Sequence, residues 1–149
     1  MVRHRPSIFA LISSILAAGI GSSAHPKIYR QADLKMREMD ERPWGRYEVL
    51  EDVDGYKVKR IEVKPGARLS LQRHSRREEH WVVVSGTADV VCGDQNLQLG
   101  AGEHVHIPKE TQHRLGNSGD ALLTLIEVQL GDYLGEDDIV RLQDDYQRP

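Results

Sequence analysis

From about residue 45 onward, apolar and polar residues alternate in short runs that are separated by turn residues. The clearest run is Tyr56–Val63, which alternates over eight residues, as a strand with one buried face does. It follows a shorter run, Tyr47–Leu50, and the dipeptide Asp54-Gly55 lies between them. Because Asp-Gly is favoured in tight turns, this stretch is predicted to form a β-hairpin.

Further short strands are predicted along the rest of the chain, after a turn at Pro65-Gly66. They cover residues 68–72, Trp81–Val84, Thr87–Val91, Leu97–Leu99, His104–Ile107 and Leu122–Leu130. Strands with turn signals at roughly 8–12-residue spacing are typical of a β-sandwich or β-barrel. No helix of any length is predicted before residue 135. We therefore expect an all-β domain over residues 42–149.

The N-terminal part of the chain has a different composition. Residues 1–24 contain a basic start, an apolar stretch of 13 residues (Ile8–Ile20) and a small-residue end. These are the parts of a secretory signal peptide, but translation starting at Met36 or Met39, or another kind of extension, explains them equally well. The apolar stretch is shorter than the roughly 20 residues of a membrane-spanning helix, so no stable membrane anchor is expected. Residues 25–41 are predicted to be a linker.

The overall composition excludes several classes of protein. The chain has 149 residues, with 20 Lys and Arg against 23 Asp and Glu, so its formal charge is −3. This balance does not favour nucleic acid as a partner. A single cysteine, Cys92, excludes an intramolecular disulfide and a cysteine-based zinc cluster. Seven histidines against one phenylalanine instead direct attention to metal or proton chemistry.

Four residues have the spacing of a metal site, namely Gln72, His74, Glu79 and the more distant His113. Side chains two apart on a strand point to the same side, so Gln72 and His74 are expected to face one cavity. Imidazole nitrogens with carboxylate and amide oxygens suit Zn²⁺, Fe²⁺, Mn²⁺, Co²⁺ or Ni²⁺. Judged on spacing alone, a solvated polar turn is the commoner explanation of these residues.

The glycines and prolines around these residues make the pattern more specific. The chain contains Gly66-x5-Gln72-x-His74-x4-Glu79-x6-Gly86 and Gly102-x5-Pro108-x-Glu110-x2-His113-x3-Asn117. This frame resembles the two motifs of the cupin superfamily, which implies a jelly-roll-like conical antiparallel β-barrel. Gln72 stands where many cupins have histidine. Glu110 stands where glycine is usual, and a left-handed backbone there would be strained by a side chain.

Longer blocks extend the resemblance over residues 42–148. They include Arg42–Glu48, Leu69–Gln72, Glu79–Ala88, Ile107-Pro108, Glu127–Gln129 and Asp132–Arg141. Together they resemble the C-terminal domain of type II mannose-6-phosphate isomerase/mannose-1-phosphate guanylyltransferase. Ser75 and Arg76 depart from that family, which commonly has two further histidines there. Because only about 40 residues precede the domain, guanylyltransferase activity is expected to be absent.

The resemblance implies a metal-dependent aldose–ketose isomerase. It would interconvert mannose 6-phosphate and fructose 6-phosphate through a cis-enediol(ate), feeding GDP-mannose and polysaccharide precursor synthesis. The implied cofactor is one divalent ion, with zinc expected first and Co²⁺, Mn²⁺ or Fe²⁺ as alternatives, and its expected ligands are Gln72, His74, Glu79 and His113. Such a substrate favours a cytoplasmic protein, whereas a genuine signal peptide would favour export.

The reaction also needs cations for the phosphate and a base that moves a proton. The phosphate candidates are Arg77 and Arg141, followed by Arg76 and Lys109. The catalytic candidates are His80, Arg141 and the acidic run Glu136–Asp138, especially Asp138. Strand alternation argues against His80, because its neighbours Glu79 and Trp81 point the other way.

Two other functions remain open at this point. One is a non-catalytic cupin that binds a sugar or a metal, and the other is a metal-dependent dioxygenase. A dioxygenase would favour iron with two or three histidines, so Gln72 weighs against it. A small sugar phosphate is the expected binding partner. A homodimer is also considered, because Leu69 and Leu71 are expected to face outward and need cover.

Overall fold

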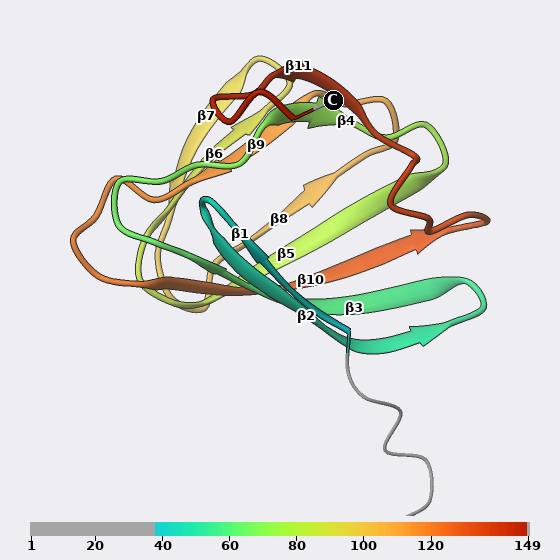
Figure 1. The fold of residues 1–149 in the computed structure, drawn as a ribbon, viewed down its shortest axis with the longest axis horizontal. Coiled ribbons are helices and arrows are strands. Elements are labelled where there is room, and N and C mark those ends of the chain that lie inside the picture. Colours follow the sequence, from blue (N-terminus) through green and yellow to red (C-terminus); the bar gives the residue numbers. More distant parts are fainter. Residues whose placement is uncertain (1–37, 149) are drawn as a thin grey trace, which may run out of the picture. The chain divides into compact units, whose positions relative to one another are not determined.

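The computed structural model describes residues 38–148, which form eleven strands and no helix (Figure 1). The expected segment 1–24 and most of the expected linker 25–41 lie outside the described residues. The strands are β1 (Met39–Arg42), β2 (Gly45–Val53), β3 (Tyr56–Val63), β4 (Leu71–Arg73), β5 (Arg77–Ser85), β6 (Ala88–Cys92), β7 (Gln95–Leu99), β8 (His104–Ile107), β9 (His113–Gly116), β10 (Leu123–Gly131) and β11 (Val140–Gln143).

The strands form two sheets that face each other (Figure 1). The six-stranded sheet has the order β1-β2-β3-β10-β5-β8, and the five-stranded sheet has the order β11-β4-β9-β6-β7. Every pair of neighbours within residues 38–148 is antiparallel. The predicted all-β architecture is therefore confirmed. In that described part there is also no helix long and apolar enough to cross a membrane.

The hairpin predicted from the alternating pattern is present as β2 and β3. Val53 pairs with Tyr56 across the turn, where Gly55 has a φ of 89° that suits glycine. Along β3 the residues alternate strictly between half-buried and buried positions, so the period of two does mark one buried face. That face includes two lysines, Lys57 and Lys59, which lie among buried groups.

Three strands were not predicted. Strand β1 begins at Met39, ahead of the expected start of the domain at Arg42, and pairs with β2. Strands β9 and β11 have four residues each, and their pairing with β6 and β4 defines them. Leu69 was expected to face outward, but it packs against the core and lines an internal cavity, which weakens the basis for a homodimer.

The interior has an apolar part and a polar part, and strand β10 runs through both. Its buried face begins with Leu123 and Leu125, which are fully buried in the core, and continues with Glu127 and Gln129. Burying two polar side chains beyond two leucines costs free energy unless they are paired, so the polar part needs an internal network. This part of the barrel carries the candidate site.

The chain crosses from one sheet to the other after β10. Residues 132–139 connect β10 of the six-stranded sheet with β11 of the five-stranded sheet (Figure 1). Lys57 Nζ donates to the carbonyl of Leu134 at 2.9 Å, and Lys59 forms an ion pair with Glu136. The buried lysines of β3 therefore hold this connection beside the polar part of the barrel.

Candidate metal centre

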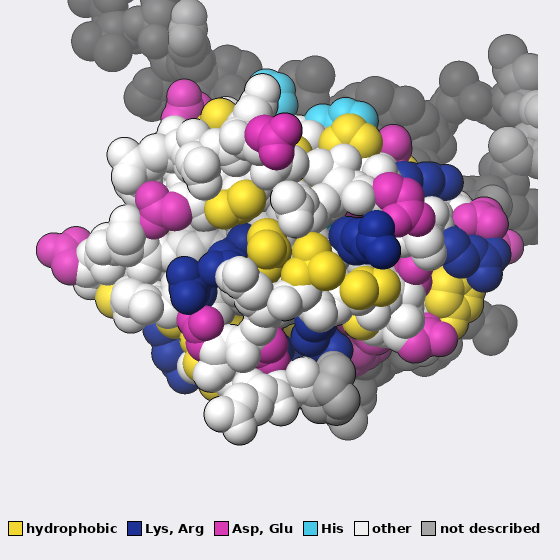
Figure 2. All heavy atoms as spheres, turned by 90° about the horizontal axis from the view of Figure 1, so that it is seen from above, with side chains coloured by type: hydrophobic (Ala, Val, Ile, Leu, Met, Phe, Trp, Pro, Cys, Tyr) yellow, Lys and Arg dark blue, Asp and Glu magenta, His cyan; other side chains and the backbone are white. Residues whose placement is uncertain are grey.

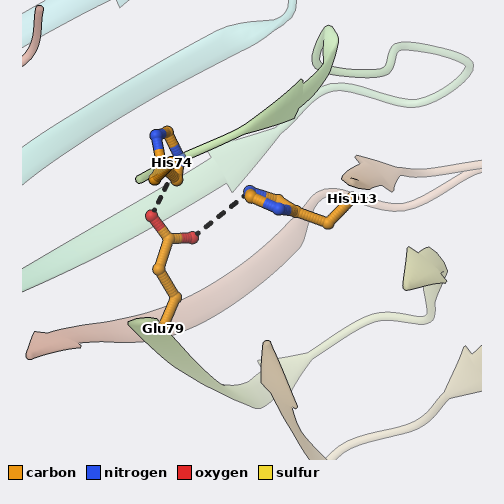
Figure 3. A group of neighbouring side chains, drawn as sticks. All are labelled: His74, Glu79 and His113. Atoms are coloured by element: carbon orange, nitrogen blue, oxygen red, sulfur yellow. Dashed lines mark ion pairs between the residues drawn. The ribbon is translucent and has the colours of Figure 1, made fainter. Parts of the chain in front are cut away.

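Three buried side chains from different segments converge in the polar part of the barrel (Figure 3). His74 follows β4, Glu79 lies on β5 and His113 lies on β9, and each is at most 2% exposed. His74 Nε2 is 3.2 Å from Glu79 Oε1, and His113 Nε2 is 3.6 Å from Glu79 Oε2. The structure therefore brings together three of the four predicted metal ligands.

The strand register explains why residues so far apart in sequence meet. Gln72 pairs with His113 on one side of β4 and with Arg141 of β11 on the other. Side chains of directly paired residues lie on the same face of a sheet, and His74 shares that face with Gln72. The Gln-x-His spacing and the β4–β9 pairing thus place the side chains of Gln72, His74 and His113 on the same face of the sheet.

Both histidines are oriented by backbone carbonyl groups. His74 Nδ1 contacts the carbonyl oxygen of Asp138 at 2.5 Å, and His113 Nδ1 contacts that of Thr111 at 2.8 Å. A carbonyl can only accept, so Nδ1 carries the proton in each ring and Nε2 faces Glu79. This is how histidine ligands of metals are usually oriented. His113 Nε2 is buried and has no hydrogen-bond partner within residues 38–148, which fits a metal ion there.

Burial and charge favour the protonation states that bind metal. Burial lowers the pKa of His113, so this ring is neutral near pH 7. Burial alone would raise the pKa of Glu79, but the hydrogen bond with His74 and the neighbouring positive groups lower it well below its usual range. A neutral imidazole at His113 and an ionised carboxylate at Glu79 are the forms that bind a metal ion.

Gln72 lies at the edge of the cluster as a fourth donor. Its Nε2 is 3.4 Å from His74 Nε2, and its Oε1 accepts a hydrogen bond from Ser70 Oγ at 2.8 Å. The hydroxyl of Ser70 can also accept, so rotating the amide by 180° would turn the oxygen of Gln72 toward the cluster at no loss of that bond. The donor set of two imidazoles, a carboxylate and an amide oxygen therefore fits a divalent ion.

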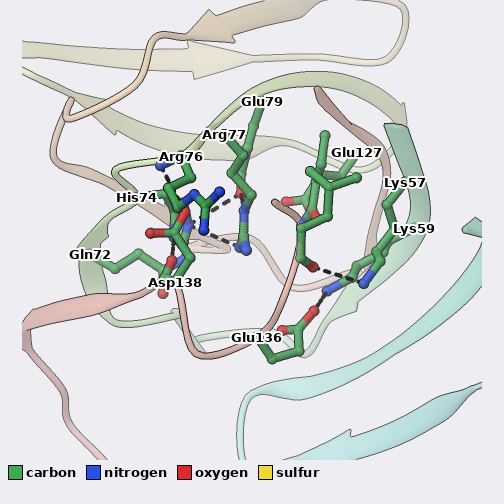
Figure 4. A network of polar contacts seen from close by, with 12 residues as sticks. Lys57, Lys59, Gln72, His74, Arg76, Arg77, Glu79, Glu127, Glu136 and Asp138 are labelled. Carbon is green, nitrogen blue, oxygen red and sulfur yellow. Dashed lines mark hydrogen bonds and ion pairs between the residues drawn. The ribbon is translucent and has the colours of Figure 1, made fainter. Parts of the chain in front are cut away.

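A cavity beside the donors is rich in charged side chains (Figure 4). Its cationic lining consists of Arg42, Lys59, Arg77, Arg141 and Arg148. Burial and repulsion from Arg148 and Arg42 lower the pKa of Arg141, so these three guanidinium groups lie close enough to repel one another. The lining also includes the carboxyl groups of Glu79, Glu127 and Glu136, and Arg77 and Lys59 form ion pairs with Glu79 and Glu136. The five cations still outnumber these three acidic groups, which favours an anionic ligand.

Two of the four predicted phosphate residues line this cavity and two do not. Arg77 and Arg141 line it, whereas Arg76 and Lys109 are exposed side chains outside it. Arg76 belongs to the turn before β5, where it forms an ion pair with Asp132 and stacks over Tyr133. Lys109 follows the end of β8 in an exposed loop. The structure therefore does not bring Arg76 and Lys109 to the cavity, because both lie on exposed turns.

The side chain of Arg77 is buried and lies deep in the cavity, next to the predicted metal ligands. Its Nε donates to Glu79 Oε1 at 3.0 Å, its Nη2 is 3.2 Å from His74 Nε2, and its Nη1 donates to the carbonyl of Gly135 at 3.1 Å. The guanidinium is therefore in contact with two predicted metal ligands and with the 132–139 connection (Figure 4). It can neutralise the Glu79 carboxylate whether or not a metal is bound.

His80, one of the predicted catalytic residues, lies on the opposite side of the sheet. Its ring stacks on that of His106 with 4.4 Å between ring centres, and both are exposed on the outer face, whereas Glu79 and Trp81 face inward. The structure therefore does not place His80 in the candidate site, as the alternation of β5 already indicates.

Asp138 supports the site but does not line the cavity. Its Oδ1 accepts hydrogen bonds from the backbone and the hydroxyl of Ser75, and its Oδ2 accepts one from the backbone of Arg76. Its carbonyl holds His74. Because its carboxylate is engaged in holding the turn before β5, a role as base is not supported. The departure from the family at Ser75 and Arg76 falls on this turn and leaves the three converging donors in place.

Sequence reasoning missed Glu127, the most suitable acid–base group of the cavity. Its Oε1 accepts from Gln129 Nε2 at 2.7 Å and its Oε2 accepts from Trp81 Nε1 at 3.0 Å. The same Trp81 nitrogen donates to Glu79 Oε2 at 3.1 Å, so Trp81 links Glu127 to the candidate metal ligand. Burial and the nearby charge of Glu79 raise the pKa of Glu127 to about 7. The sequence did contain a signal for it, because Glu127 occupies a buried-face position in the alternating strand β10.

Comparison with known proteins decides the family. The family described as mannose-6-phosphate isomerase C-terminal matches residues 29–144. The chain belongs to this family. The matched range includes both motifs and all four predicted metal ligands. The predicted resemblance is therefore confirmed at the level of the family.

Curated relatives match this chain with only part of their own length. The xanthan biosynthesis protein XanB of Xanthomonas campestris is 47% identical over 152 residues, which cover 99% of this chain and 30% of XanB. The alginate biosynthesis protein AlgA of Pseudomonas aeruginosa is 54% identical over 107 residues, which cover 72% of this chain and 22% of AlgA. The chain thus spans less than a third of either relative.

Solved structures confirm the predicted fold. A protein of Klebsiella pneumoniae with a double-stranded β-helix domain superposes with a TM-score of 0.58 at 20% sequence identity. The match covers 65% of this chain and 83% of that protein. The fold is therefore the cupin barrel that the two motifs predicted.

Proposed function

We propose that this domain is a metal-dependent aldose–ketose isomerase that interconverts mannose 6-phosphate and fructose 6-phosphate. The observation that carries the proposal is the convergence of three features in one cavity: a buried His–Glu–His donor set, a group of arginines and a buried carboxyl with a pKa near 7. The family to which the chain belongs, mannose-6-phosphate isomerase C-terminal, supports the proposal. The sugar phosphate also implies a reaction in the cytoplasm.

The donor set would hold one divalent ion, for which zinc is our first choice. His74, Glu79 and His113 would bind it, with the amide oxygen of Gln72 as the fourth protein donor. Three or four protein ligands leave room for a substrate oxygen, and the ion would supply a Lewis acid for the charge that develops there.

The cations at the cavity would bind and orient the phosphate. Arg141 lies on β11 beside Gln72, and Arg42 and Arg148 contribute from the two ends of the domain. Guanidinium groups bind phosphate oxygens with paired N–H donors, so they fix the direction of the sugar as well as its position. Because Arg141 pairs directly with Gln72, a phosphate held there would place the sugar beside the proposed metal ligands.

Glu127 would move the proton between C1 and C2. A pKa of about 7 makes the carboxyl available both as a base that accepts a proton and as an acid that returns it. Trp81 Nε1 and Gln129 Nε2 hold its two oxygens, and Lys59 provides a neighbouring positive charge. Glu127 thus takes the place that His80 and Asp138 held in the sequence-based prediction.

The roles of these residues separate in steady-state kinetics. With mannose 6-phosphate in a coupled assay, Arg141→Gln is expected to raise KM by about tenfold while kcat changes little. Glu127→Gln is expected to lower kcat by about 10²- to 10⁴-fold. Lys109→Gln removes a cation outside the cavity and serves as the matched control. Equal effects of Arg141→Gln and Lys109→Gln would contradict the assigned phosphate site.

One observation favours a second candidate, a barrel that binds a sugar phosphate without turnover. The guanidinium of Arg77 contacts both His74 Nε2 and Glu79 Oε1, so a cation already neutralises these donors. In that case the protein would bind mannose 6-phosphate in titration calorimetry with or without a chelator and would produce no fructose 6-phosphate.

A further inference from the structure

Strand β5 carries candidate metal ligands on both of its faces. Glu79 points into the barrel, whereas its neighbours Glu78 and His80 point outward. On the adjacent edge strand β8, His106 pairs directly with His80 in the antiparallel register. Directly paired side chains lie on the same face only about 5 Å apart at Cβ. The outer face of the six-stranded sheet therefore carries a second group of potential metal ligands, on the opposite side of β5 from Glu79.

The three outward side chains already point toward one another. His80 Nε2 is 3.7 Å from Glu78 Oε1, and His106 Nε2 is 3.4 Å from Glu78 Oε2. The two imidazole rings are nearly parallel, with 4.4 Å between their centres and 10° between their planes. The ligand atoms of all three lie within 4.8 Å of one another. Both rings thus present Nε2 to the same carboxylate.

We propose that Glu78, His80 and His106 form a second site, on the surface, for a divalent transition-metal ion of the zinc, nickel or copper type. Two imidazoles and one carboxylate are a donor set that such ions prefer over the all-oxygen sets of Mg²⁺ or Ca²⁺. The side chains are 35–46% exposed, which leaves them room to rotate out of the parallel ring stacking and to reach metal–ligand distances of about 2.1 Å.

This site shares no ligand with the interior cluster. The two groups lie on opposite faces of the six-stranded sheet, so metal binding at one does not require the other. A metal ion bound at the outer site would cross-link the edge strand β8 to its neighbour β5. Histidine side chains do reach the molecular surface in Figure 2, where they lie near hydrophobic groups.

His104 offers a matched control within the same strand. It is exposed, lies on the same face of β8 two residues before His106 and pairs with Val82. It therefore lies on the side of the His80–His106 pair away from Glu78, and it is absent from the group of converging donors. An exposed histidine is thus available that the proposal excludes.

The test is the number of zinc ions bound by the full chain in equilibrium dialysis. The wild type is expected to bind one ion more than His80→Ala or His106→Ala, and His104→Ala is expected to bind as many as the wild type. A count that is unchanged in both His80→Ala and His106→Ala, or equally reduced in His104→Ala, overturns the proposal. Because all three histidines are exposed, these variants are expected to fold, and circular dichroism checks this.

The interior variant His113→Ala separates the two sites. If both exist, His113→Ala lowers the count by one, and the double variant His106→Ala/His113→Ala lowers it by two. If only the outer site binds zinc, His113→Ala leaves the count unchanged while His106→Ala still reduces it. Failure of the interior metal centre is thus distinguishable from failure of the surface site.

Discussion

Glu127 provides a prediction that needs no substrate or metal. The buried carboxyl has a pKa raised to about 7 from an ordinary value of 4.5, because burial and the charge of Glu79 disfavour its ionised form. Glu127→Gln replaces it with an uncharged group of the same shape. Trp81 Nε1 can still donate to the new amide oxygen. Gln129 Oε1 is buried and has no hydrogen-bond partner among residues 38–148, so it can accept from the new amide nitrogen after the Gln129 amide rotates.

The size of the effect follows from the shift in pKa. Each pKa unit between the folded and unfolded states corresponds to about 1.4 kcal/mol. Because the folded-state pKa of Glu127 is the higher one, its contribution to stability is fully present below about pH 4.5 and is lost as the pH rises to about 7. The ionised carboxylate therefore destabilises the protein by about 3 kcal/mol at pH 8 relative to acidic solution.

Urea unfolding of the chelator-treated wild type and Glu127→Gln from pH 5 to pH 8 measures this effect. The free energy of unfolding of the variant minus that of the wild type should be about 2–3 kcal/mol larger at pH 8 than at pH 5. Taking the difference between the two proteins at each pH cancels the titration of all other groups that the variant leaves unchanged. A difference that stays constant from pH 5 to pH 8 would refute the raised pKa and the role given to Glu127.

The remaining predictions concern the metal ligands and the backbone. His113→Ala should weaken zinc affinity by about 100-fold or more, measured against a chromophoric chelator, because it removes a donor from the interior cluster. Glu110→Gly should stabilise the protein by about 0.5 kcal/mol in urea unfolding, because Glu110 has a φ of 63° and the relief of left-handed strain exceeds the entropy cost of glycine. Gly45→Ala should destabilise it by about 3 kcal/mol, since its Cβ would lie 1.9 Å from the carbonyl oxygen of Glu62. The control Gly55→Ala has open space around Cβ and should cost only about 1 kcal/mol, from its positive φ.

The sequence was most informative where local periodicity determines geometry. The alternation in Tyr56–Val63 predicted the hairpin, and the same rule argued that His80 faces away from Glu79. In each case the conformation depends on neighbouring residues only, so a pattern of a few residues carries the information.

The parts that escaped prediction depend on contacts distant in sequence. Arg42 and Arg148 line the cavity because the two ends of the domain meet there, and no local pattern marks them. Glu127 was missed because an alternating strand is expected to bury apolar residues, and only the tertiary structure shows that its hydrogen bonds come from Trp81 and Gln129. Arg76 and Lys109 were chosen for charge alone, which does not specify direction.

The most direct test of the central claim is proton NMR of mannose 6-phosphate incubated with the full chain. Samples would contain zinc, then a chelator, then zinc restored in excess. The account predicts that fructose 6-phosphate forms with zinc, stops forming after chelation and forms again when zinc is restored. A folded protein that binds the sugar phosphate but yields no fructose 6-phosphate with zinc, cobalt, manganese or iron would contradict the isomerase and leave a binding barrel.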